Sequence, residues 1–249
     1  MEITWKTFKE LASDQIETEG SFIYRGQRDA NWTLVSSLMR TDLVWSLNDF
    51  QGYFNYVLPM VMEKVQAWEG RDWNLSNELG LAEFVAYLQH NGFPTPLLDW
   101  TFSPYIAAYF AFESVDHFNP QCEQVAIYCF NQNAWSSKYK QEYDIAHNNN
   151  HVSILAPRIV GNHKLALQQG CFTFSNVRDV EVHILAHEND KENYLTKYYL
   201  SVEEKPKVIK ELSLMGISAV QLIPTIESVC KKALNDLIGL QPIGKHSDK

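Results

Sequence analysis

Several familiar signatures are missing from this 249-residue chain, and each absence narrows the functions open to it. The sequence has no G-x-x-x-x-G-K-[ST], no G-x-G-x-x-G after a predicted strand, no G-x-S-x-G and no H-E-x-x-H. Its four cysteines are widely spaced and never form C-x-x-C, so they predict neither a zinc site nor a disulfide framework. His147 and His151 have the spacing of helical metal ligands, but three asparagines separate them and disfavour a helix. We therefore expect no metal.

Long apolar runs and an excess of basic residues are also missing. No window approaches the roughly 18 apolar residues of a membrane span, and the first residues, MEITWKTFKELASD, are charged and amphipathic, unlike a signal peptide. We expect a cytoplasmic protein with reduced thiols and no membrane partner. Lysine and arginine number 21 against 30 acidic residues, giving a net charge of −9. This balance argues against broad nonspecific binding of phosphate, although a local basic pocket remains open.

The pattern of apolar residues predicts an α+β fold in a single domain, because no linker divides the chain. We expect a central mixed or antiparallel sheet flanked by helices, with a core over about residues 5–238 and a short polar tail at 241–249. Helices are predicted at 5–11, capped by Thr4, at 77–90, at 104–114, at 205–215 and after Pro224, with helical spacing over 43–68 interrupted at Pro59. Strands are predicted at 22–25, 125–130, 171–175, 180–186 and 198–202.

The segment FIYRGQ ends an apolar strand in Arg25 and Gly26. Arginine presents five donors in a fixed fork suited to phosphate or carboxylate, and glycine lets a ligand or a second backbone come close. This pairing predicts an anion clamp. The alternative is a structural arginine, buried against a carboxylate to join strand and helix.

Two more segments carry polar groups at predicted loops. QHNGFPTPLLDWTFSP holds Gln89, His90, Asp99, Trp100, Thr101 and Ser103 between two apolar helices. The structural alternative makes His90 a partner of the helix dipole, Asp99 a buried acceptor and Ser103 the cap of a helix that starts at Pro104. Gln168 lies in LQQG just before a strand, where it could orient a ligand or simply form a polar turn.

In combination these motifs resemble the FRG domain family. The matching segments are FIYRGQ, NWTLVSSLMR, LQHNGFPTPLLDWTFSPYIAAYFAF, QQGCFTFS and ISAVQLIPTIESVCKKAL, and they extend from about residue 5 to 238. The family motif has arginine where this chain has Pro96, and tyrosine where it has Asn91. If that arginine contacts a ligand in the family, this chain has lost or relocated the contact.

A second resemblance, to arginine-class ADP-ribosyltransferases, implies a split sheet and NAD as substrate. By this resemblance Arg25, with its strand neighbours Tyr24, Gly26 and Gln27, would hold the NAD phosphates or the adjoining ribose. Thr101 and Ser103 would support the nicotinamide side, with Trp100 or Tyr109 as a stacking surface. Those enzymes place a catalytic glutamate where this chain has Gln168, which cannot act as a carboxylate base. Asp99 could supply the negative charge instead, in a mixed arrangement with Gln168 and His90.

Three functions follow as hypotheses. The first is an ADP-ribosyltransferase-like enzyme that cleaves NAD and modifies a protein or nucleic-acid acceptor, acting as a toxin or phage-defence effector that a neutralising antitoxin protein could control. The second is a noncatalytic module that binds a nucleotide or a phosphorylated group. The third is a metal-dependent nuclease.

Overall fold

The computed structural model describes residues 1–17, 22–41, 44, 46–116, 118–143, 149–155 and 163–238. Within these ranges six strands form one sheet in the order β4-β5-β2-β1-β3-β6, and every neighbouring pair is antiparallel. The strands are β1 (Phe22–Gln27), β2 (Leu97–Thr101), β3 (Gln124–Asn131), β4 (Val152–Leu155), β5 (Gly170–Ser175) and β6 (Leu195–Ser201). The predicted α+β class, with an antiparallel sheet and flanking helices, is confirmed.

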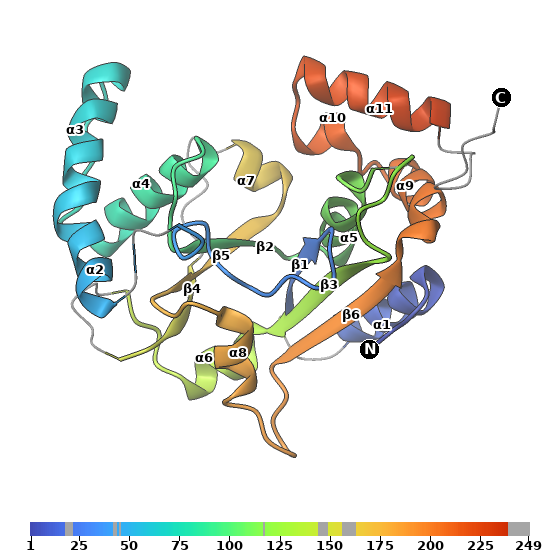
Figure 1. Ribbon diagram of the computed structural model, residues 1–249, viewed down its shortest axis with the longest axis horizontal. Helices are drawn as coiled ribbons and strands as arrows, with labels where there is room; N and C mark the ends of the chain where they lie inside the picture. The colour runs from blue at the N-terminus through green and yellow to red at the C-terminus, as the bar shows by residue number, and fades with distance from the viewer. Residues whose placement is uncertain are drawn as a thin grey trace.

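Helices surround the sheet in three groups (Figure 1). One group lies against the half of the sheet that contains β5: α2 (Leu47–Gly52), η1 (Tyr53–Val57), α3 (Leu58–Glu69) and α4 (Glu78–His90). A second lies near β1, β3 and β6: α1 (Trp5–Glu17), α5 (Pro104–Glu113), η2 (Val202–Glu204), α9 (Lys205–Leu214), α10 (Ala219–Leu222) and α11 (Ile226–Ile238). The third group, α6 (Gln132–Lys138) and α8 (Val180–Leu185), packs with Leu98 and Trp100, and the short α7 (His163–Leu167) precedes β5.

The side chains of β2 show which helices pack on each face of the sheet. Leu97 packs with α2, α3 and α4, whereas Leu98 and Trp100 pack in a different core with α6 and α8. Asp99 and Thr101 share the face of Leu97, because successive side chains of a strand point to opposite faces. Two separate helix groups thus cover that face, and Asp99 lies at the border between them.

The strands β1 and β2 share fewer paired residues than any other neighbouring strands of the sheet. These strands pair at one position only, Tyr24 with Thr101, whereas β1 pairs with β3 from Phe22 to Gln27 along its whole length. The sheet therefore consists of two three-stranded halves joined at a single pair. Beyond that pair the facing edges of β1 and β2 are free to take side chains or a ligand.

Several predicted elements and caps are confirmed. Thr4 accepts a hydrogen bond from the backbone of Thr7 at 3.2 Å, although α1 runs six residues further than predicted, to Glu17. Ser103 caps α5 with Pro104 in the first turn. The helical segment around Pro59 passes through a turn of π-helix before α3, consistent with the missing N–H of proline.

The predicted strand at 180–186 is wrong, because this segment is the helix α8. The side chain of Asp179 caps it by accepting from the backbone of Val182 at 3.1 Å, and Val180 and Ile184, one turn apart, are fully buried. Tertiary packing of that apolar pair overrides the β-branched alternation V-x-V-x-I. None of β4, α6, α7 and α10 was predicted from the sequence, and the segment of β2 was not assigned to a strand. The tail 241–249 and His147 lie outside the described residues, and none of the described helices is long and apolar enough to cross a membrane.

Candidate functional site

Arg25 fills the opening between β1 and β2. Its Nη1 donates to the backbone oxygen of Asp99 at 2.7 Å, and the same nitrogen lies 3.9 Å from the Asp99 carboxylate. The guanidinium thereby satisfies a strand carbonyl that the parting of the two strands leaves without a ladder partner. Burial lowers the pKa of Arg25, an effect that the Asp99 carboxylate opposes. Nε of Arg25 is buried and has no hydrogen-bond partner within the described part of the chain.

Gly26 allows α5 to lie directly on β1. A Cβ at this position would stand 1.9 Å from the backbone oxygen of Ala107 and 2.6 Å from the backbone nitrogen of Ala111. Any other residue would force strand and helix apart. This close approach brings Phe110 of α5 beside Arg25, at the place where two cavities meet.

The smaller cavity has a volume of about 380 Å³ and lies at the border of the two helix groups. Its lining residues are Tyr24, Arg25, Gly26, Gln89, His90, Asp99, Trp100, Thr101, Ala107, Phe110, Gln168 and Ile223. The fold therefore brings together all of the predicted site residues except Gln27, Ser103 and Tyr109. They come from β1, α4, β2 and the turn before β5, which are far apart in the sequence.

Asp99 is the one carboxylate among these lining residues, and its orientation is fixed. Gln89 Nε2 donates to its Oδ1 at 3.0 Å, while the hydroxyl of Thr95 donates to Gln89 Oε1. Because Oε1 is engaged by Thr95, the amide of Gln89 must present its NH₂ group to Asp99. The Asp99 side chain nevertheless remains 62% exposed, so a ligand can reach it.

His90 ends α4 with one ring nitrogen engaged. Its Nδ1 lies 2.8 Å from the backbone oxygen of Ala86, which can only accept, so Nδ1 carries the hydrogen. In the neutral ring Nε2 is then an acceptor, available as a base. The ring packs edge-on against Phe172, with centroids 6.3 Å apart.

Thr101 connects the end of β2 to the turn before β5. Its hydroxyl donates to the backbone oxygen of Gln168 at 2.7 Å and accepts from the backbone nitrogen of Ser103 at 3.1 Å. The Gln168 side chain is directed to the backbone oxygen of Leu222, 3.4 Å away. The next residue, Gln169, has a left-handed φ of 47°, which sharpens the turn. Thr101 and Ser103 therefore have structural partners: Thr101 positions Gln168, and Ser103 caps α5.

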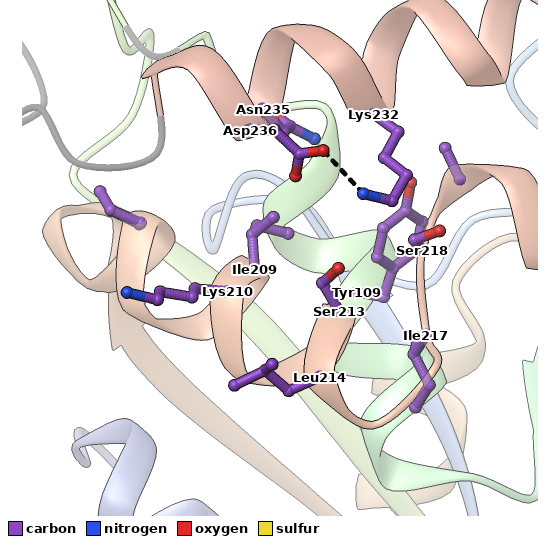
Figure 2. Close-up of a pocket in the computed structure, with 12 residues that line it drawn as sticks. Tyr109, Ile209, Lys210, Ser213, Leu214, Ile217, Ser218, Lys232, Asn235 and Asp236 are labelled. Atoms are coloured by element: carbon purple, nitrogen blue, oxygen red, sulfur yellow. Dashed lines mark hydrogen bonds and ion pairs between the residues drawn. The ribbon is translucent and has the colours of Figure 1, made fainter.

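The expected stacking role does not fit Trp100 or Tyr109. The indole of Trp100 is buried in the core against Phe130, and its N–H donates to Thr173 at 3.1 Å. Tyr109 points into a separate pocket between α5, α9, α10 and α11, where Figure 2 shows it near Ser218 and Lys232. Both residues occupy positions fixed by helix and strand packing, which the sequence pattern could not resolve. Tyr24 also lies in the core, with its hydroxyl donating to Gln15 at 2.8 Å.

The larger cavity, about 990 Å³, shares Arg25, Gly26 and Phe110 with the smaller one. Its other lining residues are Gln27, Arg28, Asn31, Trp32, Thr33, Val35, Met39, Arg40, Ser114 and Arg178. The described residues that line this cavity thus include four arginines and no carboxylate, in a chain whose net charge is −9. Such a local concentration of guanidinium groups is suited to an anionic ligand.

Of the lining residues of the larger cavity, only Arg25, Gly26 and Gln27 were predicted from the sequence; those not predicted include Arg28, Trp32, Arg40, Phe110 and Arg178. Trp32 and Arg40 belong to the motif segment NWTLVSSLMR, so that motif was the signal that could have found them. Arg178 comes from the loop after β5, and nothing in the local sequence separates it from a solvated surface arginine. Only the fold places it opposite β1.

Comparison with protein families agrees with the motifs. Residues 20–120 match the FRG domain, so this part of the chain belongs to the FRG domain family. The matched region contains β1, the segment from Arg28 to Arg40, β2 and α5, and thus most of both cavities. No curated protein and no solved structure matched the chain.

Proposed function

We propose that the chain binds NAD across the two cavities and cleaves its nicotinamide–ribose bond, as an ADP-ribosyltransferase-like enzyme. The observation that carries this proposal is the meeting of the cavities at Arg25, with four arginines along one cavity and Asp99 as the one carboxylate among the described lining residues of the other. The charges of NAD complement this arrangement: its anionic pyrophosphate suits the arginines, and its cationic nicotinamide riboside suits the Asp99 carboxylate.

Asp99 supplies negative charge where the reaction develops positive charge. The bond between ribose C1′ and the nicotinamide nitrogen breaks, and its electron pair leaves with neutral nicotinamide. The ribose becomes oxocarbenium-like, and a fixed carboxylate stabilises that state. Gln89 and Thr95 hold the Asp99 carboxylate in place, so little reorganisation is needed.

The reaction ends when a nucleophile bonds to C1′ and loses a proton. His90 Nε2 is the group in the smaller cavity suited to accept that proton. The nucleophile is water or a group on a protein or nucleic-acid acceptor. In this proposal the enzyme acts as a toxin or defence effector, and a neutralising partner protein would hold it inactive.

Binding without catalysis is the second candidate function. Gln168, at the position of the expected glutamate, is directed to a backbone carbonyl, and the Arg25 fork is partly engaged by Asp99. A nuclease would need a metal site, and the described residues contain no cluster of three or more His, Cys, Asp and Glu residues suited to one.

The test is to incubate the protein with NAD, with and without cell extract, and to quantify nicotinamide by chromatography. We expect Asp99→Asn to keep NAD binding and lose nicotinamide release by at least about 100-fold, the scale of one electrostatic group in a transition state. Arg25→Lys weakens NAD binding, because lysine lacks the planar fork. The matched controls are Asp72→Asn and Arg71→Lys, both exposed and outside the cavities.

Each other outcome selects a different function. NAD binding without nicotinamide release by the wild type selects the noncatalytic module. Nucleic-acid cleavage that EDTA stops selects the nuclease. Intact NAD with every acceptor, together with no shift in the melting temperature, overturns the NAD proposal.

A further inference from the structure

Trp32 lines the larger cavity and is more exposed to solvent than most tryptophans of the described chain. The residue is 46% exposed, whereas most tryptophans of the described chain pack in the cores. The guanidinium carbon of Arg28 lies 5.0 Å from the centre of its ring. An aromatic ring with a cation against it and solvent beside it is a surface to which another flat ring can bind.

Hydrogen bonds hold the backbone of Trp32 in place. The backbone oxygen of Trp32 accepts from Lys197 Nζ at 3.1 Å and lies 2.9 Å from the hydroxyl of Tyr128, which shares its one hydrogen between this oxygen and the Glu181 carboxylate. The backbone nitrogen of Trp32 donates to the backbone oxygen of Asp29 at 3.2 Å, in a turn that the Asp29 side chain also stabilises. The main chain that carries the ring is therefore fixed before any ligand arrives, and Arg28 packs against the ring, so less freedom is lost on binding.

We propose that Trp32, with Arg28 against its ring, binds the base of a nucleotide whose phosphates lie among the arginines of the same cavity. This inference rests on the proposed nucleotide site, because it assigns the far part of that site to the adenine end of NAD. The pyrophosphate then lies near Arg25 and Arg40, and the nicotinamide end reaches Asp99 in the smaller cavity.

Charge favours a nucleotide over a protein partner at this ring. Four arginines and no carboxylate are among the described residues that line the cavity beside Trp32, and a nucleotide carries phosphate as well as a base. Stacking on an aromatic side chain contributes to the binding of any base, since every base has a π face. Arg28 can contact both the ring and a phosphate, because a guanidinium is planar and charged.

The experiment uses the full chain and three probes: ADP, inorganic pyrophosphate and nicotinamide mononucleotide. We expect calorimetry to show that Trp32→Ala weakens ADP binding by about 5- to 150-fold, the range for losing one base–aromatic stack. Pyrophosphate and nicotinamide mononucleotide, which carry no adenine, should bind the variant as they bind the wild type. Trp32→Phe should restore most of the ADP affinity.

Trp68→Ala is the matched control, because Trp68 on α3 is 88% exposed and lines neither cavity. It should leave ADP binding unchanged. The inference is overturned if wild type does not bind ADP, if Trp32→Ala binds ADP as well as wild type does, or if it weakens ADP and pyrophosphate equally.

The outcomes separate this inference from the proposed reaction. Nicotinamide release from NAD with ADP affinity unaffected by Trp32→Ala would refute the base-binding role and keep the enzyme. ADP binding that depends on Trp32, together with intact NAD, would keep the base-binding role and refute the enzyme.

Discussion

Arg25 and Gly26 are neighbours in the chain but act on different parts of the structure. Arg25 reaches across the opening between β1 and β2 to Asp99, whereas Gly26 removes the side chain that would separate β1 from α5. For Arg25 the sequence left open an anion clamp or a structural arginine buried against a carboxylate, and for Gly26 the close approach of a ligand or of a second backbone. The sequence could not indicate that α5 is the element that approaches Gly26. It also could not indicate that Arg25 lies closer to the backbone oxygen of Asp99, at 2.7 Å, than to its carboxylate, at 3.9 Å.

Gly26→Ala tests the contact between β1 and α5. The new Cβ would meet backbone atoms at 1.9 and 2.6 Å, which cannot move as a side chain can. We expect the free energy of unfolding to fall by about 3 kcal/mol, the upper part of the usual range for overpacking. Urea unfolding followed by circular dichroism measures this change.

Gly52→Ala is the matched control for that prediction. Gly52 is helical, with φ near −60°, and a Cβ there would have nothing within 4 Å. Alanine should therefore stabilise the protein by roughly 0.5–1 kcal/mol. Equal destabilisation by both variants would contradict the close-packing explanation for Gly26.

At the level of elements, α5 was predicted well and α8 was not. Ser103 and Pro104 set the start of α5 locally, and its apolar side chains favour burial on nearly every face of the helix. The segment of α8 alternates like a strand, and its helical form depends on the Asp179 cap and on where Val180 and Ile184 can be buried. Local sequence signals therefore predict the type of an element correctly when they agree with its tertiary packing. When they disagree, the packing determines whether the segment is a helix or a strand.

Ser103→Ala tests the cap of α5. The hydroxyl oxygen accepts from the backbone nitrogen of Ile106 at 3.3 Å, so its removal leaves that donor unsatisfied at the start of a buried helix. We expect a loss of about 0.5–2 kcal/mol in the free energy of unfolding, measured in urea. Ser103→Asp should recover most of it, because aspartate caps equally well.

Ser136→Ala serves as the control and should be close to neutral, because Ser136 is an exposed residue of α6. If Ser103→Asp were as destabilised as Ser103→Ala, the loss would come from something other than capping.

In the whole molecule, two half-sheets and two helix groups create the cavities. The single pair of Tyr24 and Thr101 holds β1 to β2, and the gap between the helix groups exposes Asp99 on one face. Arg178 joins Arg25, Arg28 and Arg40 at this place from a segment distant in sequence, and the net acidic charge of the chain does not predict such a local cluster. Metal-free, membrane-free and cytoplasmic character remain predictions of the sequence.

The molecule should lose stability in alkaline solution because of its buried thiols. Burial raises the pKa of Cys129 and of Cys171 to about 12 each, whereas an unfolded thiol has a pKa near 8.5. Their contribution is fully present below the unfolded pKa and is lost as pH rises towards the folded pKa, since only the unfolded chain releases these protons. At pH 10 the loss is about 1–2 kcal/mol per thiol.

Urea unfolding at pH 8 and pH 10 measures this loss. We expect the decrease between the two values to be smaller in a variant that combines Cys129→Ala and Cys171→Ala. Cys230→Ala is the control, because that thiol is exposed and should leave the decrease unchanged. Buried tyrosines add to the decrease in every variant, so an equal decrease in all of them would contradict the role of the thiols.

By itself the sequence determined the FRG motifs, most helices and strands, and the segments that form the smaller cavity, because caps, apolar periodicity and glycine act over a few residues. Only the tertiary structure decided that β1 and β2 pair at one position and that the Trp100 indole packs in the core and Tyr109 in a separate pocket. It also decided that Trp32 and four arginines line the larger cavity, and that Phe110 lines both. Those features depend on contacts between distant segments, where packing rather than local propensity sets the direction of each side chain.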